Sequence, residues 1–125
     1  MIFDTDVLIW VQRGNEKAAR TVDRSNDRHI SIVTYMELLQ ATKNKKQHDC
    51  VSDFLKEFGF QTLALTENIG HRAAVYVEEY CLSHGIRAVD AIIAATATEN
   101  HVPLCSGNAK HFRAIEGLKF KVFRP

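Results

Sequence analysis

Short apolar segments alternate with helical patterns along the whole length of this chain of 125 residues. Strands that are separated by helices favour right-handed β-α-β crossovers, and these crossovers place the strands parallel in one sheet. The alternation therefore predicts an α/β fold whose parallel sheet is covered by helices on both faces. The expected strands are Met1–Asp4, His29–Val33, Phe60–Leu65, Val102–Ser106 and Phe120–Phe123.

The segments between the expected strands carry the signals of helices. Thr66–Ser83 has apolar residues on one face and is followed by Gly85, which favours a helix end at that point. Ala88–Asn100 is apolar nearly all round, so we expect it to be buried. Further helices are expected to start at Thr5-Asp6 and to span Glu16–Arg24, Thr34–Lys45, Gln47–Phe58 and Asn108–Phe112.

Composition limits the function classes. Hydrophobic residues make up 46% and charged residues 25%, which is ordinary for a globular domain and excludes general disorder. The length is typical of one domain, which we place at residues 1–125. The net charge is only +1, which excludes a strongly basic nucleic-acid binder. The charge is uneven, because residues 107–125 hold five basic residues and one acidic residue, or +4.

Targeting and redox signals indicate the cytoplasm. The longest apolar runs are five residues, far below the roughly 20 that a membrane-spanning helix needs. The N-terminal residues lack the basic region and the cleavage site of a signal peptide. Cys50, Cys81 and Cys105 are odd in number and widely spaced, so we expect neither a disulfide framework nor a zinc site. We therefore expect a cytoplasmic protein without a membrane segment.

Acidic and amide side chains follow several of the expected strands. Asp4 and Asp6 come at the end of the first strand, Glu37 follows the second, Asp90 begins the buried helix, and Asn108 follows the fourth strand. Because ligands bind at the carboxyl ends of parallel strands, we expect these side chains to share one edge of the sheet. Converging carboxylates repel one another unless a cation lies between them, and Mg²⁺ or Mn²⁺ prefers such oxygen ligands. The pattern predicts a divalent metal site that activates water for attack on a phosphodiester.

Each of these residues also has a purely structural interpretation. Glu37 completes a capping box with Thr34, in which the glutamate reaches back to the cap amide. Asp90 is harder to explain in this way, because it lies in the apolar run Val89–Ala95, where an uncompensated carboxylate is costly to bury. A helix cap or a turn is the alternative role of Asp4, Asp6 and Asn108, and for Asp6 and for Asn108 taken alone it is the favoured one.

Four segments resemble, in order, the motifs of PIN-domain proteins. The first, Ile2–Ile9, has an apolar strand followed by Asp-Thr-Asp-Val-Leu-Ile, and the third, Val89–Ala97, has Asp-Ala-Ile-Ile-Ala-Ala-Thr-Ala. The second, Ser31–Leu39, centres on Glu37, and the last is Pro103–Phe112. The four motifs span the whole chain in order, and together they are more specific than any one of them alone.

The resemblance implies a PIN-like three-layer fold, in which helices flank a central parallel five-stranded sheet. Among PIN-domain proteins, a chain of this length resembles the VapC toxins of type II toxin–antitoxin systems. Those toxins are Mg²⁺- or Mn²⁺-dependent ribonucleases, usually homodimeric and silenced by a VapB antitoxin. The resemblance thus implies a Mg²⁺ or Mn²⁺ cofactor, RNA as the substrate, a VapB-like antitoxin as the partner, and a homodimer.

Carried onto this chain, the resemblance assigns the metal-site acids to Asp4, Glu37 and Asp90. Asn108 takes the fourth catalytic position, where many family members have aspartate. Because Asn108 brings no charge, a second metal would be held less firmly. In the mechanism that the resemblance implies, Asp4, Asp90 and Asn108 hold one metal, and Glu37 holds or orients the water that attacks phosphorus.

Residues beside these acids have supporting roles in the same hypothesis. Asp6 is a weaker metal candidate beside Asp4. Ser106 stands where the family usually has threonine, and its hydroxyl is expected to bond a ligand or a metal-bound water. His111 fits a general acid or an exposed structural histidine equally well. The expected RNA backbone contacts, each of which also fits a solvated surface charge, are Lys43, Lys45, Lys46, Lys110, His111 and Arg113.

Two other functions stay open. A catalytically silent PIN-like binding module fits if Asn108 marks a decayed site, although the retained acids argue against it. A receiver-type phospho-acceptor domain needs an aspartate after the third strand, where this chain has Thr66-Glu67-Asn68, so this function is strongly disfavoured. Four aromatic residues fit either a monomer core or an interface with a second copy or an antitoxin: Trp10, Tyr35, Tyr76 and Tyr80.

Overall fold

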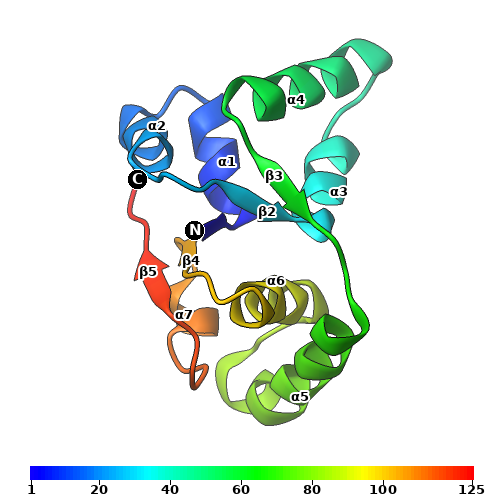
Figure 1. Ribbon diagram of the computed structural model, residues 1–125, viewed down its shortest axis with the longest axis vertical. Helices are drawn as coiled ribbons and strands as arrows, with labels where there is room; N and C mark the ends of the chain where they lie inside the picture. The colour runs from blue at the N-terminus through cyan, green and yellow to red at the C-terminus, as the bar shows by residue number, and fades with distance from the viewer.

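The computed structural model describes all 125 residues and contains one sheet of five parallel strands (Figure 1). The strands lie in the order β3-β2-β1-β4-β5. The predicted fold class, in which helices flank a central parallel five-stranded sheet, is confirmed. The strands are β1 (Ile2–Phe3), β2 (His29–Ser31), β3 (Gln61–Leu63), β4 (Leu104–Ser106) and β5 (Phe120–Val122).

Seven helices form two layers, one on each face of the sheet. Successive side chains of a strand point to opposite faces. Ile2 and Leu104 therefore join one core cluster with α5, α6 and α7, while Phe3 and Cys105 join the other with α1 to α4. The helices are α1 (Thr5–Gln12), α2 (Glu16–Asp23), α3 (Ile32–Gln40), α4 (Lys45–Glu57), α5 (Glu67–His84), α6 (Ala88–Glu99) and α7 (Ala109–Phe112).

The two-residue strand β1 lies at the centre of the sheet, and both of its side chains are fully buried. The strands β2 and β3 lie on one side of it, and β4 and β5 lie on the other. The direction of winding therefore reverses between β1 and β4. The Asp4 N–H donates to the Cys105 carbonyl at 2.9 Å, so the pairing of these strands continues past the end of β1. In open parallel sheets, such a reversal leaves a crevice at the carboxyl ends of the strands where ligands bind.

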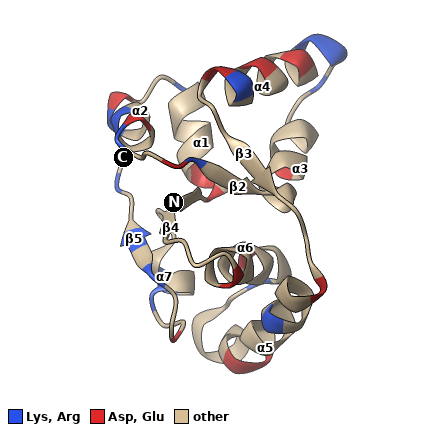
Figure 2. Ribbon diagram, viewed as in Figure 1, with Lys and Arg blue, Asp and Glu red and all other residues tan.

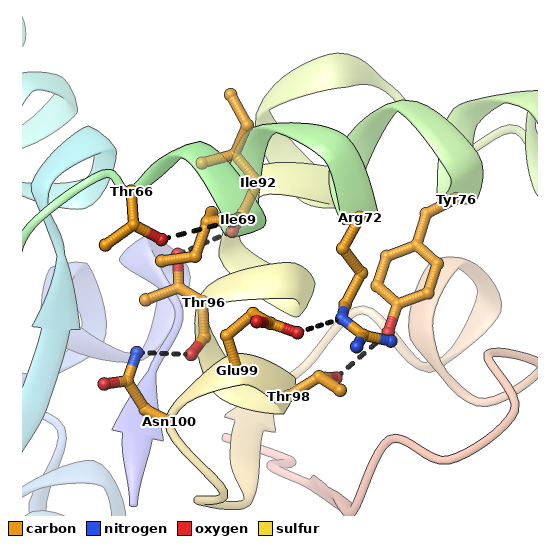
Figure 3. A network of polar contacts seen from close by, with 9 residues as sticks. All are labelled: Thr66, Ile69, Arg72, Tyr76, Ile92, Thr96, Thr98, Glu99 and Asn100. Atoms are coloured by element: carbon orange, nitrogen blue, oxygen red, sulfur yellow. Dashed lines mark hydrogen bonds and ion pairs between the residues drawn. The ribbon is translucent and has the colours of Figure 1, made fainter.

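The helix pair α5 and α6 covers one face of the sheet. Helix α5 begins after Thr66, whose Oγ1 accepts the Ile69 N–H at 3.2 Å, and it ends at Gly85, which adopts a φ of 69°. Polar contacts join α5 to the buried α6. In one of them the Tyr76 hydroxyl of α5 donates to Thr98 Oγ1 of α6 at 3.0 Å (Figure 3). The predicted helix end at Gly85 and the predicted burial of α6 are confirmed.

The start of α3 differs from the expectation. The helix begins at Ile32 rather than at Thr34, because the Ser31 Oγ accepts the Val33 N–H at 3.2 Å and caps the helix earlier. Glu37 therefore lies beyond the first turn, and the predicted capping box between Thr34 and Glu37 does not form. The strand before it ends at Ser31 for the same reason.

The connection from α3 to α4 also differs. The predicted helix through Lys45 ends at Gln40, and the helix that follows begins at Lys45 rather than at Gln47. The reason is Asn44, whose Oδ1 accepts the Gln47 N–H at 2.9 Å and caps α4. None of the seven helices is both long enough and apolar enough to cross a membrane.

Candidate functional site

Asp4 lies where β1 passes into α1 and is 8% exposed. Its Oδ1 accepts the Thr5 N–H at 2.8 Å, which makes Asp4 the N-cap of α1. Its Oδ2 accepts the Ser106 hydroxyl at 2.7 Å. The cap role that the sequence favours for Asp6 therefore belongs to Asp4, and that prediction was wrong. Asp4 combines the cap with a buried position at the carboxyl end of the central strand.

Asp6 lies in the first turn of α1 and faces the loop after β4. Its Oδ2 accepts the Gly107 N–H at 2.9 Å, while its Oδ1 is buried without a hydrogen-bond partner. A Cβ at Gly107 would lie 2.7 Å from Asp6 Oδ2, so a side chain at this position would displace the Asp6 carboxylate. Gly107 is thus a site residue that the sequence analysis missed, although it stands inside the last motif.

Ser106 connects the loop after β4 to Asp4. The Asn108 N–H donates to the Ser106 Oγ at 3.0 Å, and the Ser106 hydroxyl in turn donates to Asp4. A hydroxyl has one proton to donate in a hydrogen bond, and Ser106 donates it to the Asp4 carboxylate. Ser106 thereby holds the Asp4 carboxylate in place. The expectation that Ser106 also bonds a ligand or a metal-bound water stays a prediction, because its oxygen keeps a second lone pair.

Asp90 lies in the first turn of α6 and is tied to α7. Its Oδ2 accepts the Arg87 N–H at 3.3 Å and lies 2.9 Å from His111 Nδ1. The Asn108 Nδ2 lies 2.8 Å from the same Nδ1. When Nδ1 carries the ring proton and donates it to the Asp90 carboxylate, the Asn108 amide must turn its oxygen toward the ring, because Nδ2 is also a donor. The structure brings Asp90, Asn108 and His111 together, as the motif spacing predicts.

Glu37 is connected to the other acids through Thr5. The Thr5 Oγ1 lies 2.6 Å from Glu37 Oε1 and 3.1 Å from Thr34 Oγ1. The single proton of Thr5 is donated to the carboxylate, so the Thr34 hydroxyl must donate to Thr5. Thr5 stands directly after Asp4 and therefore places Glu37 near the end of β1. The sequence analysis used Thr5 only as a helix start and missed this role.

The aspartates influence one another electrostatically. Burial, and to a lesser extent the charges of Asp6 and Asp90, raise the pKa of Asp4 from 3.8 to about 7, against hydrogen bonds from Ser106 and Thr5 that lower it. Burial also raises the pKa of Asp6, with a smaller contribution from Asp90 and against the hydrogen bond from Gly107. In the absence of a cation, Asp4 is therefore partly protonated at neutral pH.

The donor set has the chemistry of a hard divalent cation site. No three His, Cys, Asp or Glu side chains are grouped closely enough to hold a metal ion between them. Mg²⁺, however, keeps several waters and is held by one or two carboxylates, which this arrangement offers. The unpartnered Asp6 Oδ1 and the raised pKa of Asp4 both favour a positive charge at this point. Burial raises the pKa of Cys105 to about 11, so no thiolate ligand competes. The residues thus fit Mg²⁺ or Mn²⁺.

The expected RNA-contact residues fall into two groups. Lys110 and Arg113 are exposed and belong to α7 and its C-terminal end, next to the site. Figure 2 shows further Lys and Arg along β5. Lys43 lies in the connection between α3 and α4, which Figure 1 places at the end of the molecule opposite α7. Lys45 pairs with Asp49 at 3.6 Å. Within one chain, only the first group accompanies the site.

The comparisons with known proteins identify the fold. The family model of the PIN domain matches residues 1–118. A chain of the toxin–antitoxin complex from Klebsiella pneumoniae is 27% identical with a TM-score of 0.80, over 98% of this chain and 95% of that chain. A chain of VapBC-1 from nontypeable Haemophilus influenzae is 25% identical with a TM-score of 0.76, over 98% of each chain. A chain of VapBC2 from Rickettsia felis, bound to a promoter DNA fragment, shares the fold at 20% identity and a TM-score of 0.80, over 99% of this chain and all of that chain. The comparison with curated proteins found no match.

The raised pKa of Asp4 predicts how stability depends on pH in metal-free protein. The folded chain keeps a proton on Asp4 up to about pH 7, whereas the unfolded chain releases it near the ordinary pKa of 3.8. The contribution of Asp4 to the free energy of unfolding should therefore be greatest below pH 4 and fall as pH rises to 7, by up to about 1.4 kcal/mol per pH unit. Urea unfolding in EDTA between pH 5 and 8 measures this slope.

The isosteric change Asp4→Asn replaces the titratable carboxyl group with an amide and keeps an N-cap for α1. The slope should become flatter in this variant, and at pH 7 and above the variant should be more stable than the parent chain. Asp49→Asn is the control, because Asp49 is exposed on α4 and pairs only with Lys45. Equal slopes in the parent chain and Asp4→Asn would contradict the assignment.

Proposed function

This chain belongs to the PIN-domain family, and from this premise we propose that it is a divalent-metal-dependent endoribonuclease of the VapC toxin type, acting in the cytoplasm. The observation that carries the proposal is the convergence of Asp4, Asp6 and Asp90 at the point where the sheet reverses its winding. Burial raises the pKa values of Asp4 and Asp6, the charges of neighbouring aspartates add to this, and a bound cation would offset the cost that remains.

The roles of individual residues follow from their contacts. Asp4 and Asp90 would hold the ion, with the free Oδ1 of Asp6 beside them. When bound, a divalent ion neutralises charge on the phosphodiester and makes water a better nucleophile. Ser106 keeps the Asp4 carboxylate oriented, and His111 does the same for Asp90.

Glu37 has a different position from the aspartates. Thr5 occupies its Oε1, so Oε2 is the oxygen that is left to accept a hydrogen bond from water. We therefore assign to Glu37 the orientation of the attacking water and the acceptance of its proton. The water adds to phosphorus as the bond from phosphorus to the leaving ribose oxygen breaks, and that oxygen takes up a proton from solvent.

The nuclease proposal is tested with purified protein, mixed RNA and Mn²⁺. We expect EDTA to abolish cleavage, and we expect Asp4→Asn and Asp90→Asn each to lower it at least about 100-fold, because the amide removes a charged metal ligand. Asp49→Asn should cleave like the parent chain. Cleavage products are resolved on denaturing gels with end-labelled RNA.

Two outcomes would contradict the nuclease proposal. Cleavage that ignores both the chelator and the two substitutions would exclude the metal mechanism. Binding of RNA without cleavage, in Mn²⁺ and in Mg²⁺ alike, would favour the catalytically silent binding module instead.

A small antitoxin is the partner that we propose. The support is the likeness to chains of toxin–antitoxin complexes, at 27% and 25% identity over 98% of this chain. Expression of the chain in a bacterial host should arrest growth, and Asp90→Asn should not. Co-expression of a short open reading frame that adjoins the gene should restore growth and yield a complex that co-purifies. Equal growth with the parent chain and with Asp90→Asn, at equal protein levels, would contradict the toxin assignment.

We also propose that the chain forms a homodimer through α5 and the start of α6. An apolar hollow of about 240 Å³ lies there, and Leu65 at its rim is 52% exposed. Leu65→Lys should convert the dimer to a monomer in light scattering coupled to size exclusion. Leu82→Lys is the matched control, since Leu82 is 98% exposed on α5 and does not line the hollow. A dimer that survives Leu65→Lys would place the interface elsewhere, and a monomeric parent chain would exclude it.

A further inference from the structure

A second hollow adjoins the acidic site, and Asp90 is not part of its lining. It has a volume of about 480 Å³ and lies between α1, the loop after β4 and the end of the chain that follows β5. Asp6, Gly107 and Asn108 belong both to this hollow and to the site described above. The remaining wall is contributed mainly by Trp10, Phe123 and Arg124.

Trp10 has the character of a binding residue. It is the only tryptophan of the chain, and it lies on α1 about one turn after Asp6. It packs against the core beside α1 but keeps part of its surface exposed at the hollow. Packing alone does not require an indole at a half-exposed position. An exposed indole provides a flat apolar surface of the kind on which nucleobases stack.

Positive charge accompanies the indole. Arg124 is exposed and lines the same hollow, and the guanidinium of Arg13 lies over the Trp10 ring at 5.9 Å from its centroid. Arginine pairs with phosphate through two parallel hydrogen bonds. An aromatic wall with guanidinium groups beside it is the combination found where proteins bind single-stranded nucleic acid.

We propose that this hollow binds one unpaired nucleotide of a single-stranded RNA, with its base against Trp10 and a phosphate at Arg124. The inference rests on the proposed function, because the nucleotide would adjoin the phosphodiester held at Asp4 and Asp90. The hollow and the acid site share Asp6, Gly107 and Asn108, so a strand that fills both passes continuously from one to the other. A base held in a duplex cannot enter, since its faces are covered by stacking.

The single tryptophan allows a direct test that does not depend on cleavage. A short single-stranded RNA and an abasic strand with the same backbone are titrated into the full chain in EDTA, where a metal-dependent nuclease does not cut. We expect the RNA to quench the Trp10 fluorescence in a saturable manner and the abasic strand not to do so. Equal quenching by the two strands, or quenching by neither, would overturn the base site.

Substitutions separate the ring from the charge. Trp10→Leu keeps the apolar packing without a stacking surface, and we expect it to weaken RNA binding about ten-fold in fluorescence anisotropy with labelled RNA. Trp10→Phe keeps a smaller ring and should bind between Trp10→Leu and the parent chain. Arg124→Gln should weaken binding and lower its dependence on salt by about one counterion.

Matched controls identify effects of folding and of charge in general. Phe58→Leu alters a half-buried aromatic residue that packs against the same core but does not line this hollow. Lys56→Gln removes an exposed cation on α4. Both controls should bind RNA like the parent chain, and urea unfolding should show that Trp10→Leu stays folded. Affinity losses as large in Phe58→Leu as in Trp10→Leu would overturn the proposal.

The base site and the nuclease function can fail separately. If Mn²⁺-dependent cleavage is present and Trp10→Leu has the KM of the parent chain, the base site is overturned and the nuclease stands. If base-dependent quenching is present and no cleavage occurs, the base site stands and the nuclease falls. If both hold, we expect Trp10→Leu to raise KM with little change in kcat, because Trp10 contacts a base and not the reacting phosphate.

Discussion

The geometry of the site depends on the hydrogen bond from the Ser106 hydroxyl to Asp4 Oδ2. It is buried, 2.7 Å long, and joins two strand ends that are 102 residues apart in sequence. A hydrogen bond to a charged group contributes about 1.5–3 kcal/mol. Ionising a carboxylate whose pKa is raised from 3.8 to about 7 costs about 4 kcal/mol at neutral pH. This cost remains after the Ser106 hydrogen bond has lowered the pKa, so the bond orients Asp4 and offsets only part of its burial, and the packing of the sheet holds the residue in place.

That packing leaves Asp4 little freedom. Ile2 belongs to the core under α5 and α6, and Phe3 belongs to the core under α1 to α4. A shift of β1 by one residue would exchange the two faces, so its register is fixed. Leu104 and Cys105 fix β4 in the same way. The residues that follow these two strands consequently meet at one edge, which is why Gly107 approaches Asp6 closely enough to exclude a Cβ.

The sequence was sufficient for the sheet and for the edge at which the acids gather, because the ends of parallel strands must meet there. It was not sufficient for details that depend on loops. Ser31 and Thr34 are both good caps, and only the structure shows which of them begins α3. The contact between Asp90 and His111 spans 21 residues and depends on how α7 docks against α6. Gly107 belongs to no periodic pattern, so its role in holding Asp6 could not be predicted.

The separate attachment of Glu37 explains how four acids can share one site. The charges that raise the pKa of Asp4 come from Asp6 and Asp90, and Glu37 is not among them. Glu37 accepts a hydrogen bond from the Thr5 hydroxyl instead. A cation that offsets the repulsion among the aspartates would leave the charge of Glu37 available to polarise water. Two neighbouring residues thus separate the two roles. Asp4, which Ser106 holds in place, belongs to the cation-binding group, and Thr5 holds Glu37, the separate base.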